Sequence, residues 1–209
     1  MTACVRSTWL LLCVALALGC WRAPYPEDMY LQHIPTVLVL LVWPWALRRY
    51  PLSCTALACL ALFLLLHIIG ARYLYSSVPY ERWLHELPQL DLASALDAQR
   101  NHYDRMVHFA FGLLWVRPVQ EIGLRYAGFS PRAALYVAVE FALAASMLYE
   151  VFEWSLTLWL SSEAALAYNG QQGDVWDAQK DMALAASGAL AGALLLRMRR
   201  DPAHGAAAA

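Results

Sequence analysis

Charged side chains are scarce in this chain. Only 15% of its 209 residues are Asp, Glu, Lys or Arg, whereas 61% are hydrophobic; soluble domains average about 25% charged residues. So large an apolar share indicates a lipid solvent rather than a larger core. Lys180 is the single lysine, the arginines are scattered, and the net charge is −1. With no basic face to follow a phosphate backbone, the composition argues against nucleic acid as a partner.

Several common functional motifs are also absent from the sequence. The five cysteines stand in or beside apolar runs without CxxC spacing, so we interpret them as small apolar residues. There is no GxSxG, no HExxH and no Gly-rich phosphate loop, which removes the usual signatures of serine hydrolases, zinc proteases and nucleotide-binding proteins.

Long apolar runs dominate what is present. Six of them are long enough, or nearly so, to cross a hydrocarbon layer of about 30 Å; they cover residues 7–20, 31–47, 53–73, 104–119, 133–160 and 181–196. We therefore predict an all-α fold, a polytopic transmembrane helix bundle, with residues 1–209 forming a single integral membrane domain. The first run follows Arg6 and ends in "ALGC" at Cys20, so a cleaved signal peptide is the alternative to a first membrane helix.

Arginine marks one side of the predicted membrane. Arg6 precedes the first run, and the short connections or tails after the second, fourth and sixth runs hold Arg48, Arg49, Arg117, Arg125, Arg132, Arg197, Arg199 and Arg200. Since cytoplasmic loops are enriched in arginine and lysine, both termini are predicted to be cytoplasmic. The longest outward connection, residues 76–102, is expected to form short surface helices interrupted at Pro88. The alanine-rich tail, residues 201–209, is expected to be frayed.

Ionisable residues gather at the predicted outward ends of the last three runs, in "NHYDRMVHFAFG", "YEVFEW" and "GDVWDAQKDM". Helical spacing places those of each stretch on one face, and each face continues into small residues. Small residues let transmembrane helices approach closely, so Gly188 and Gly192 are expected to contact a neighbouring helix and the acids to point into the bundle. The candidate site residues are Asp104, His108, Glu150, Glu153, Asp177 and Asp181, with His67 as a weaker candidate.

Each candidate also has a purely structural interpretation. Asp174 and Asp177 suit the N-cap and first turn of a helix, and Asp181 would pair with Lys180 or an arginine. Asp104 would be a cap, His108 a hydrogen-bonded core histidine, and the glutamates would lie on a helix that projects into water. We favour one shared site, because a carboxylate at the centre of a membrane helix costs about 2.5–3.5 kcal/mol and the nearby cations are too few to neutralise all of them.

The same three stretches resemble the recognisable blocks of the YjdF-like bacterial inner-membrane proteins, a family classed as a domain of unknown function. The likeness covers most of the chain from the second run onward. It implies a multi-pass protein of the bacterial inner (plasma) membrane and supplies no catalytic assignment. More distantly, the order of an Asp/His helix, a glutamate helix and an Asp-led small-residue helix resembles VanZ-like membrane proteins, which are linked to glycopeptide-antibiotic resistance. The long outward loop and extra acids depart from that pattern, so no resistance role is carried over.

Several carboxylates beside one imidazole suit a divalent cation such as Mg²⁺, Mn²⁺ or Zn²⁺. The predicted ligands are His108, Glu150, Glu153 and Asp181. At headgroup depth a bound cation would polarise a phosphoryl or ester oxygen and activate water, with a carboxylate as general base. The hypothesis is metal-assisted hydrolysis or transfer on a lipid or lipid-linked envelope substrate. The alternatives are a proton- or ion-coupled transporter that uses the same residues, and a scaffold whose polar faces only hold helices together.

Overall fold

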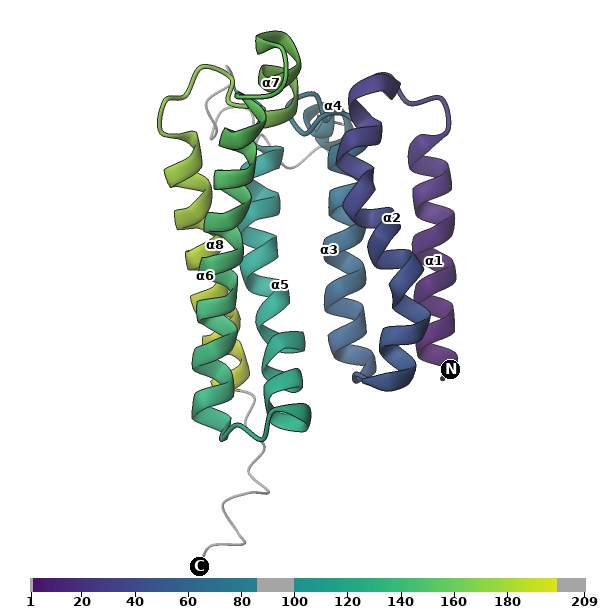
Figure 1. Ribbon diagram of the computed structural model, residues 1–209, viewed down its shortest axis with the longest axis vertical. Coiled ribbons are helices and arrows are strands. Elements are labelled where there is room, and N and C mark those ends of the chain that lie inside the picture. Colours follow the sequence, from purple (N-terminus) through teal and green to yellow (C-terminus); the bar gives the residue numbers. More distant parts are fainter. Residues whose placement is uncertain (1, 86–99, 199–209) are drawn as a thin grey trace, which may run out of the picture.

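The structure is a computed structural model that describes residues 2–85 and 100–198. Within these residues all regular secondary structure is helical: α1 (Ala3–Cys20), α2 (Pro26–Arg49), α3 (Cys54–Arg72), α4 (Tyr80–His85), α5 (Tyr103–Tyr126), α6 (Pro131–Leu156), α7 (Ser162–Asn169) and α8 (Asp177–Met198). Figure 1 shows the long helices side by side, with α1–α3 in one group and α5, α6 and α8 in the other. The short helices α4 and α7 lie at one end, which we call the outer end because it is predicted to face outwards.

Five of the described helices, α1, α2, α3, α6 and α8, are long and apolar enough to cross a membrane. The predicted fourth span corresponds to α5, which has sufficient length at 24 residues but is not among those five. Its ends carry Asp104 and Arg105 on one side and Glu121 and Arg125 on the other. Because α5 packs against α3, α6 and α8, protein rather than lipid covers much of its surface, and it requires less apolar surface than a lipid-facing helix.

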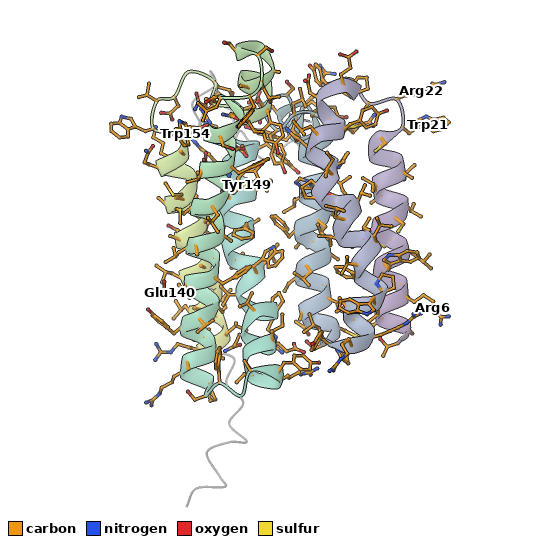
Figure 2. All side chains as sticks on the ribbon, in the orientation of Figure 1. Arg6, Trp21, Arg22, Glu140, Tyr149 and Trp154 are labelled. Carbon is orange, nitrogen blue, oxygen red and sulfur yellow. A yellow bond between two sulfur atoms is a disulfide. The ribbon has the colours of Figure 1, made fainter. Side chains whose placement is uncertain are left out.

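The two ends of the bundle carry different side chains. Trp21 and Trp154 lie near the outer end and Arg6 lies at the opposite end (Figure 2). The two tryptophans are 68% and 63% exposed, as expected for an aromatic belt at a membrane interface. Helix α1 begins and α8 ends at the same end of the bundle (Figure 1), which agrees with the prediction that the termini share a side. That this side is the cytoplasm stays a prediction.

The α1–α3 group has a core of bulky apolar side chains, with Leu12 and Leu57 fully buried and Leu64 nearly so. Trp9 fixes α1 in this group, since its indole N–H donates to the Leu40 carbonyl at 2.8 Å. In this structure the first apolar run therefore packs as a helix against α2 and α3, and its alternative as a cleaved signal peptide stays open. The structure also pairs Cys4 of α1 with Cys54 of α3, whose Cα atoms are 6.1 Å apart, where the sequence had indicated only small apolar residues.

The α5–α8 pair is packed backbone to backbone. A Cβ atom added to Gly188 would lie 2.0 Å from the Phe109 carbonyl oxygen, and one added to Gly192 would lie 2.7 Å from that of Leu113. From the other side, a Cβ on Gly112 would lie 1.9 Å from the Ala185 carbonyl oxygen. These distances leave no room for any side chain. The predicted contact of Gly188 and Gly192 with a neighbouring helix is confirmed.

Local signals set the helix boundaries around α6. Ser130 caps the helix by accepting a hydrogen bond from the Ala133 N–H at 3.3 Å, Pro131 is the first helical residue, and Gly128 has φ +67°. The sequence itself indicates this boundary, because glycine favours a helix end, serine an N-cap and proline the first helical position. The helix ends at Leu156, four residues before the predicted end at residue 160, because Thr157 begins a series of tight turns. Pro88 and the tail at 201–209 lie outside the described residues.

Candidate functional site

Three of the candidate residues converge at the outer end of α5 and α8. Asp104, His108 and Asp181 each offer one ligand atom, and these atoms lie within 4.8 Å of one another. Asp104 and His108 share a face of α5 because they are four residues apart. Asp181 joins them because the glycine contacts just below bring the two helix backbones together. The small-residue stripe therefore sets the position of the charged residues above it.

Helix α6 adds a carboxylate and a hydroxyl to this group. His108 Nε2 lies 3.7 Å from both Asp104 Oδ1 and Glu150 Oε1, which is too long for a direct hydrogen bond. Glu150 Oε1, Asp181 Oδ1 and Ser146 Oγ are buried and have no hydrogen-bond partner among the described residues. Asp181 and Ser146 are each only 2% exposed. Buried polar atoms are normally satisfied, so the arrangement favours an ion or water between these groups.

Asp177 and Asp174 lie in a separate layer of ion pairs above the cluster. Asp177 pairs with the buried Arg100, whose guanidinium also donates to the Gln171 carbonyl at 2.6 Å. Asp174 pairs with Arg105 at 2.5 Å and with Lys180 at 2.6 Å. The hydrogen bond from Lys180, then that from the Trp176 N–H, lower the Asp174 pKa to about 2. Asp177 is thus adjacent to the cluster but neutralised by an arginine.

Glu153 is half-buried and lies one turn from Glu150 on α6, where its carboxyl faces Tyr149. Its backbone carbonyl accepts a hydrogen bond from Asn169 Nδ2 at 3.2 Å, which ties α6 to α7. It does not belong to the three-residue group whose ligand atoms converge. The structure therefore places Glu153 at the rim of the predicted site rather than among the converging ligand atoms.

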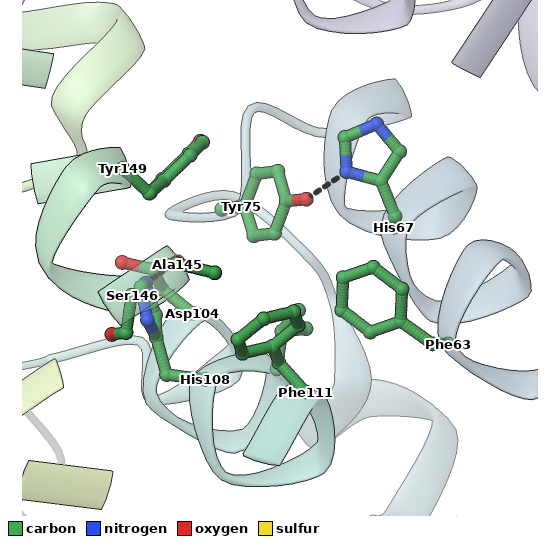
Figure 3. Close-up of a pocket in the computed structure, with 10 residues that line it drawn as sticks. Phe63, His67, Tyr75, Asp104, His108, Phe111, Ala145, Ser146 and Tyr149 are labelled. Atoms are coloured by element: carbon green, nitrogen blue, oxygen red, sulfur yellow. Dashed lines mark hydrogen bonds and ion pairs between the residues drawn. The ribbon is translucent and has the colours of Figure 1, made fainter. Parts of the chain in front are cut away.

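A cavity of about 170 Å³ opens beside the cluster. Its lining comes from α3, the turn after α3, α5 and α6: Phe63, His67, Tyr75, Asp104, Val107, His108, Phe111, Ala145, Ser146 and Tyr149. Figure 3 shows Asp104, His108 and Ser146 on one wall and the hydrogen-bonded pair of His67 and Tyr75 on the other. The cavity is mainly apolar, with ionisable groups on both walls.

Two residues of this region were not among the candidates from the sequence, and Arg72 contacts a different part of the protein. Arg100 and Tyr75 were not proposed, because each reaches the site through a turn rather than through helix periodicity. In the sequence, Arg72 follows the third apolar run and would offer a further cation to the acids, but its guanidinium donates to the carbonyl oxygens of Gly19 and Trp21 at 2.7 and 2.8 Å. It therefore stabilises the end of α1 instead.

Long apolar helices around a buried acidic cluster are typical of a polytopic membrane protein. The chain belongs to the DUF2238 family of predicted membrane proteins, whose family pattern matches residues 5–202. It is 32% identical over 169 residues to the inner membrane protein YjdF of Escherichia coli (strain K12), an alignment that covers 79% of this chain and 76% of that protein. No solved structure matches the chain. The predicted family and the location as a multi-pass protein of the bacterial inner membrane are both confirmed.

Proposed function

We propose that this protein is a divalent-cation-dependent enzyme that catalyses hydrolysis or group transfer on a lipid or lipid-linked envelope substrate. The observation that carries the proposal is the convergence of Asp104, His108 and Asp181 to within 4.8 Å. Ligand atoms about 2.0–2.6 Å from one ion are necessarily within about twice that distance of each other. The limit of 4.8 Å lies within that distance for the longest of these bonds and slightly above it for Mg²⁺ or Zn²⁺, so the side chains would move slightly closer together around a bound ion.

The charge balance supports a cation at this position. Among the described residues, the Lys and Arg side chains form their ion pairs with Asp174, Asp177 and Glu121. Among the same residues, the ion-pair partner of Asp104 and of Glu150 is His108 alone, and Asp181 has no ion-pair partner. An uncompensated carboxylate inside a membrane protein is costly, and such groups generally pair, coordinate an ion or line a wet cavity. A divalent cation would compensate two of these charges at once.

The remaining groups have roles in the proposed chemistry. A cation on Asp104, His108 and Asp181 would polarise a phosphoryl or ester oxygen of the substrate. Glu150, whose Oε1 has no hydrogen-bond partner among the described residues and lies 3.7 Å from His108 Nε2, would accept a proton from an attacking water. Phe63, Val107 and Phe111 give the cavity apolar walls, which suits the boundary between a lipid headgroup and its chains.

Metal analysis of the detergent-purified protein, followed by Mn²⁺ titration by electron paramagnetic resonance, tests the proposal. The parent is expected to bind one ion, and Asp181→Asn to bind it at least tenfold more weakly while remaining folded. Asp174→Asn is the matched control, because it removes a nearby carboxylate of the ion-pair layer, and its metal content is expected to equal that of the parent. A parent that neither retains metal nor binds added Mn²⁺ contradicts the proposal. Turnover of a lipid extract by the metal-loaded protein would then identify the reaction.

A proton-coupled transporter is the second candidate, favoured by the ionisable groups on both cavity walls. Asp104 and His108 face His67 and Tyr75 across a cavity of about 170 Å³. Ionisable groups on both sides of such a cavity could pass protons from one wall to the other. In proteoliposomes, a substrate-dependent proton flux that persists in the presence of a chelator would favour transport. Lipid turnover abolished by the same chelator would favour the enzyme.

A further inference from the structure

The cavity wall opposite the acids is built around Tyr75. The residues Leu74 and Tyr75 have φ values of 53° and 55°, a left-handed conformation that non-glycine residues rarely adopt. The turn is closed by a hydrogen bond from the Tyr75 N–H to the Gly70 carbonyl at 2.7 Å. Gly70 also leaves space for the Tyr75 ring, since a Cβ atom on Gly70 would lie 2.6 Å from Tyr75 Cε1. Such backbone conformations are concentrated at functional sites, and here the result is a phenol held in the cavity wall.

The hydrogen bonds of His67 fix the direction in which the Tyr75 hydroxyl points. His67 forms no ion pair with a carboxylate among the described residues, so we assign its ring as neutral. Its Nε2 lies 3.1 Å from the Gln32 backbone carbonyl oxygen, which only accepts hydrogen bonds, so Nε2 carries the proton of the ring. Nδ1 is then an acceptor, and it is hydrogen-bonded to the Tyr75 hydroxyl. The Tyr75 O–H therefore donates to His67. Burial raises the pKa of Tyr75 well above its usual value, so the phenol stays protonated.

Because the Tyr75 O–H is used in the hydrogen bond to His67, the hydroxyl oxygen offers a ligand only its lone pairs, which accept hydrogen bonds. This wall of the cavity therefore accepts hydrogen bonds, whereas the opposite wall would present the cation that Asp104, His108 and Asp181 hold in the proposed function. The space between them, about 170 Å³, is smaller than the roughly 300–1,000 Å³ of typical small-molecule pockets. It suits a compact headgroup whose hydrocarbon chains remain in the bilayer.

We propose that the Tyr75–His67 pair binds a hydroxyl group of the substrate, and that the substrate is an anionic phospholipid with a free hydroxyl on its headgroup. The phosphate faces the cation and the hydroxyl donates to the Tyr75 oxygen. This assignment rests on the proposed function for the cation side. The hydroxyl side stands on the direction of the His67 and Tyr75 hydrogen bonds.

Two lipids with the same phosphodiester charge test the assignment, namely phosphatidylglycerol and phosphatidylmethanol, which lacks the headgroup hydroxyls. Their binding to the Mn²⁺-loaded protein in detergent is measured by native mass spectrometry. One additional hydrogen bond is expected to give the parent a preference of about fivefold to tenfold for phosphatidylglycerol. Tyr75→Phe is expected to remove that preference and to leave Mn²⁺ binding unchanged.

Tyr103→Phe is the matched control. The Tyr103 ring lies 6.2 Å from that of Tyr75, and its hydroxyl donates to the Leu66 carbonyl at 2.9 Å rather than facing the cavity. This variant is expected to keep the preference for phosphatidylglycerol. Equal binding of the two lipids by the Mn²⁺-loaded parent, or a preference that survives in Tyr75→Phe, overturns the assignment and leaves the metal site intact. A parent that binds no Mn²⁺ refutes the proposed function, and the assignment with it.

Discussion

The two halves of the bundle, α1–α3 and α5, α6 and α8, pack their helices with different kinds of residue. In α1–α3, large apolar residues such as Leu12 and Leu57 fill the space between helices. In α5 and α8, Gly112 and Gly188 bring the helix backbones into contact. The acidic cluster lies in the second half, directly above that contact. The comparison indicates that close backbone approach is what allows short carboxylate side chains from separate helices to meet.

Buried polar groups also differ between the halves. In the first half, His33 and Thr36 on α2 are nearly inaccessible and have no hydrogen-bond partner among the described residues, and Arg72 satisfies backbone carbonyls of α1. In the second half, Arg100 and Arg105 satisfy carboxylates. Among the described residues, only the second half brings acids from different helices together, which is why we assign the candidate site to that half.

The largest expected effect comes from adding volume to the glycine contact. Gly188→Leu forces a side chain onto the Phe109 carbonyl, where even a Cβ atom would lie 2.0 Å away. Overpacking commonly costs about 1–3 kcal/mol and occasionally more. Here the clash is with backbone atoms of α5, which cannot move aside unless the two helices separate, so the cost is expected to exceed that range and those of the changes below. About 1 kcal/mol shifts Tm by roughly 2–4 °C for a chain of this size. We expect a loss of at least about 6 °C in detergent, measured by thermal unfolding.

Gly192→Leu provides a graded comparison, because the corresponding distance is 2.7 Å and the expected loss is smaller. Leu190→Ala is the control on the same helix, since Leu190 is 62% exposed and its removal should leave Tm near that of the parent. If both glycine variants melt like the parent, α8 does not contact α5 as described.

The next prediction distinguishes an acid of the ion-pair layer, Asp177, from an acid of the cluster, Asp181. Asp177→Asn leaves Arg100 buried, at 9% side-chain exposure, without its anionic partner, and breaking a buried pair typically costs about 3–5 kcal/mol. We expect a marked fall in Tm with little change in Mn²⁺ affinity. Asp181→Asn should show the reverse, because it relieves an uncompensated charge but removes a ligand. If both variants change Tm and Mn²⁺ affinity to the same extent, the ion-pair layer and the cluster do not have separate roles.

A smaller effect is expected from removing volume in the first half. Leu57→Ala creates a cavity at a fully buried position of the α1–α3 core, and such changes cost about 2–5 kcal/mol in soluble proteins. The lower part of that range is expected here, because lipid tails weaken the hydrophobic driving force between membrane helices. Thermal unfolding should show the loss while Mn²⁺ binding stays unchanged. A loss of Mn²⁺ binding in this variant would show that the halves are coupled.

The features that sequence predicted well are local ones. Apolar length located the helices, and Ser130, Pro131 and Gly128 located a helix boundary, because each acts through its own backbone within a few residues. The spacing of Asp104 and His108 put both on one face of α5. Asp181 was also placed correctly inside the bundle, because the small residues that follow it marked the contacting face.

The features that sequence missed depend on turns and on distant pairing. Asp177 and Arg100 are 77 residues apart in sequence, and no periodicity relates them. Tyr75 reaches the cavity only because two consecutive residues adopt a left-handed conformation, which neither Leu74 nor Tyr75 favours intrinsically. The hydropathy of α5 is low for a membrane helix because its neighbours cover it, and that depends on the tertiary arrangement.

The smallest expected effect concerns Asp174 of the ion-pair layer, whose side chain is 17% exposed, and it depends on pH. The Asp174 pKa is lowered to about 2, first by the hydrogen bond from Lys180, against about 3.9 in an unfolded chain. A lowered carboxyl pKa contributes stability that is fully present above about pH 4 and is lost as pH falls through about 2. Asp174→Asn should therefore lower Tm slightly at pH 7, and the difference from the parent should shrink between pH 4 and pH 2. Val175→Ala, at an adjacent residue that is 84% exposed, should show no such pH dependence. A difference that stays constant down to pH 2 would assign the Asp174 effect to the shape of the loop rather than to its charge.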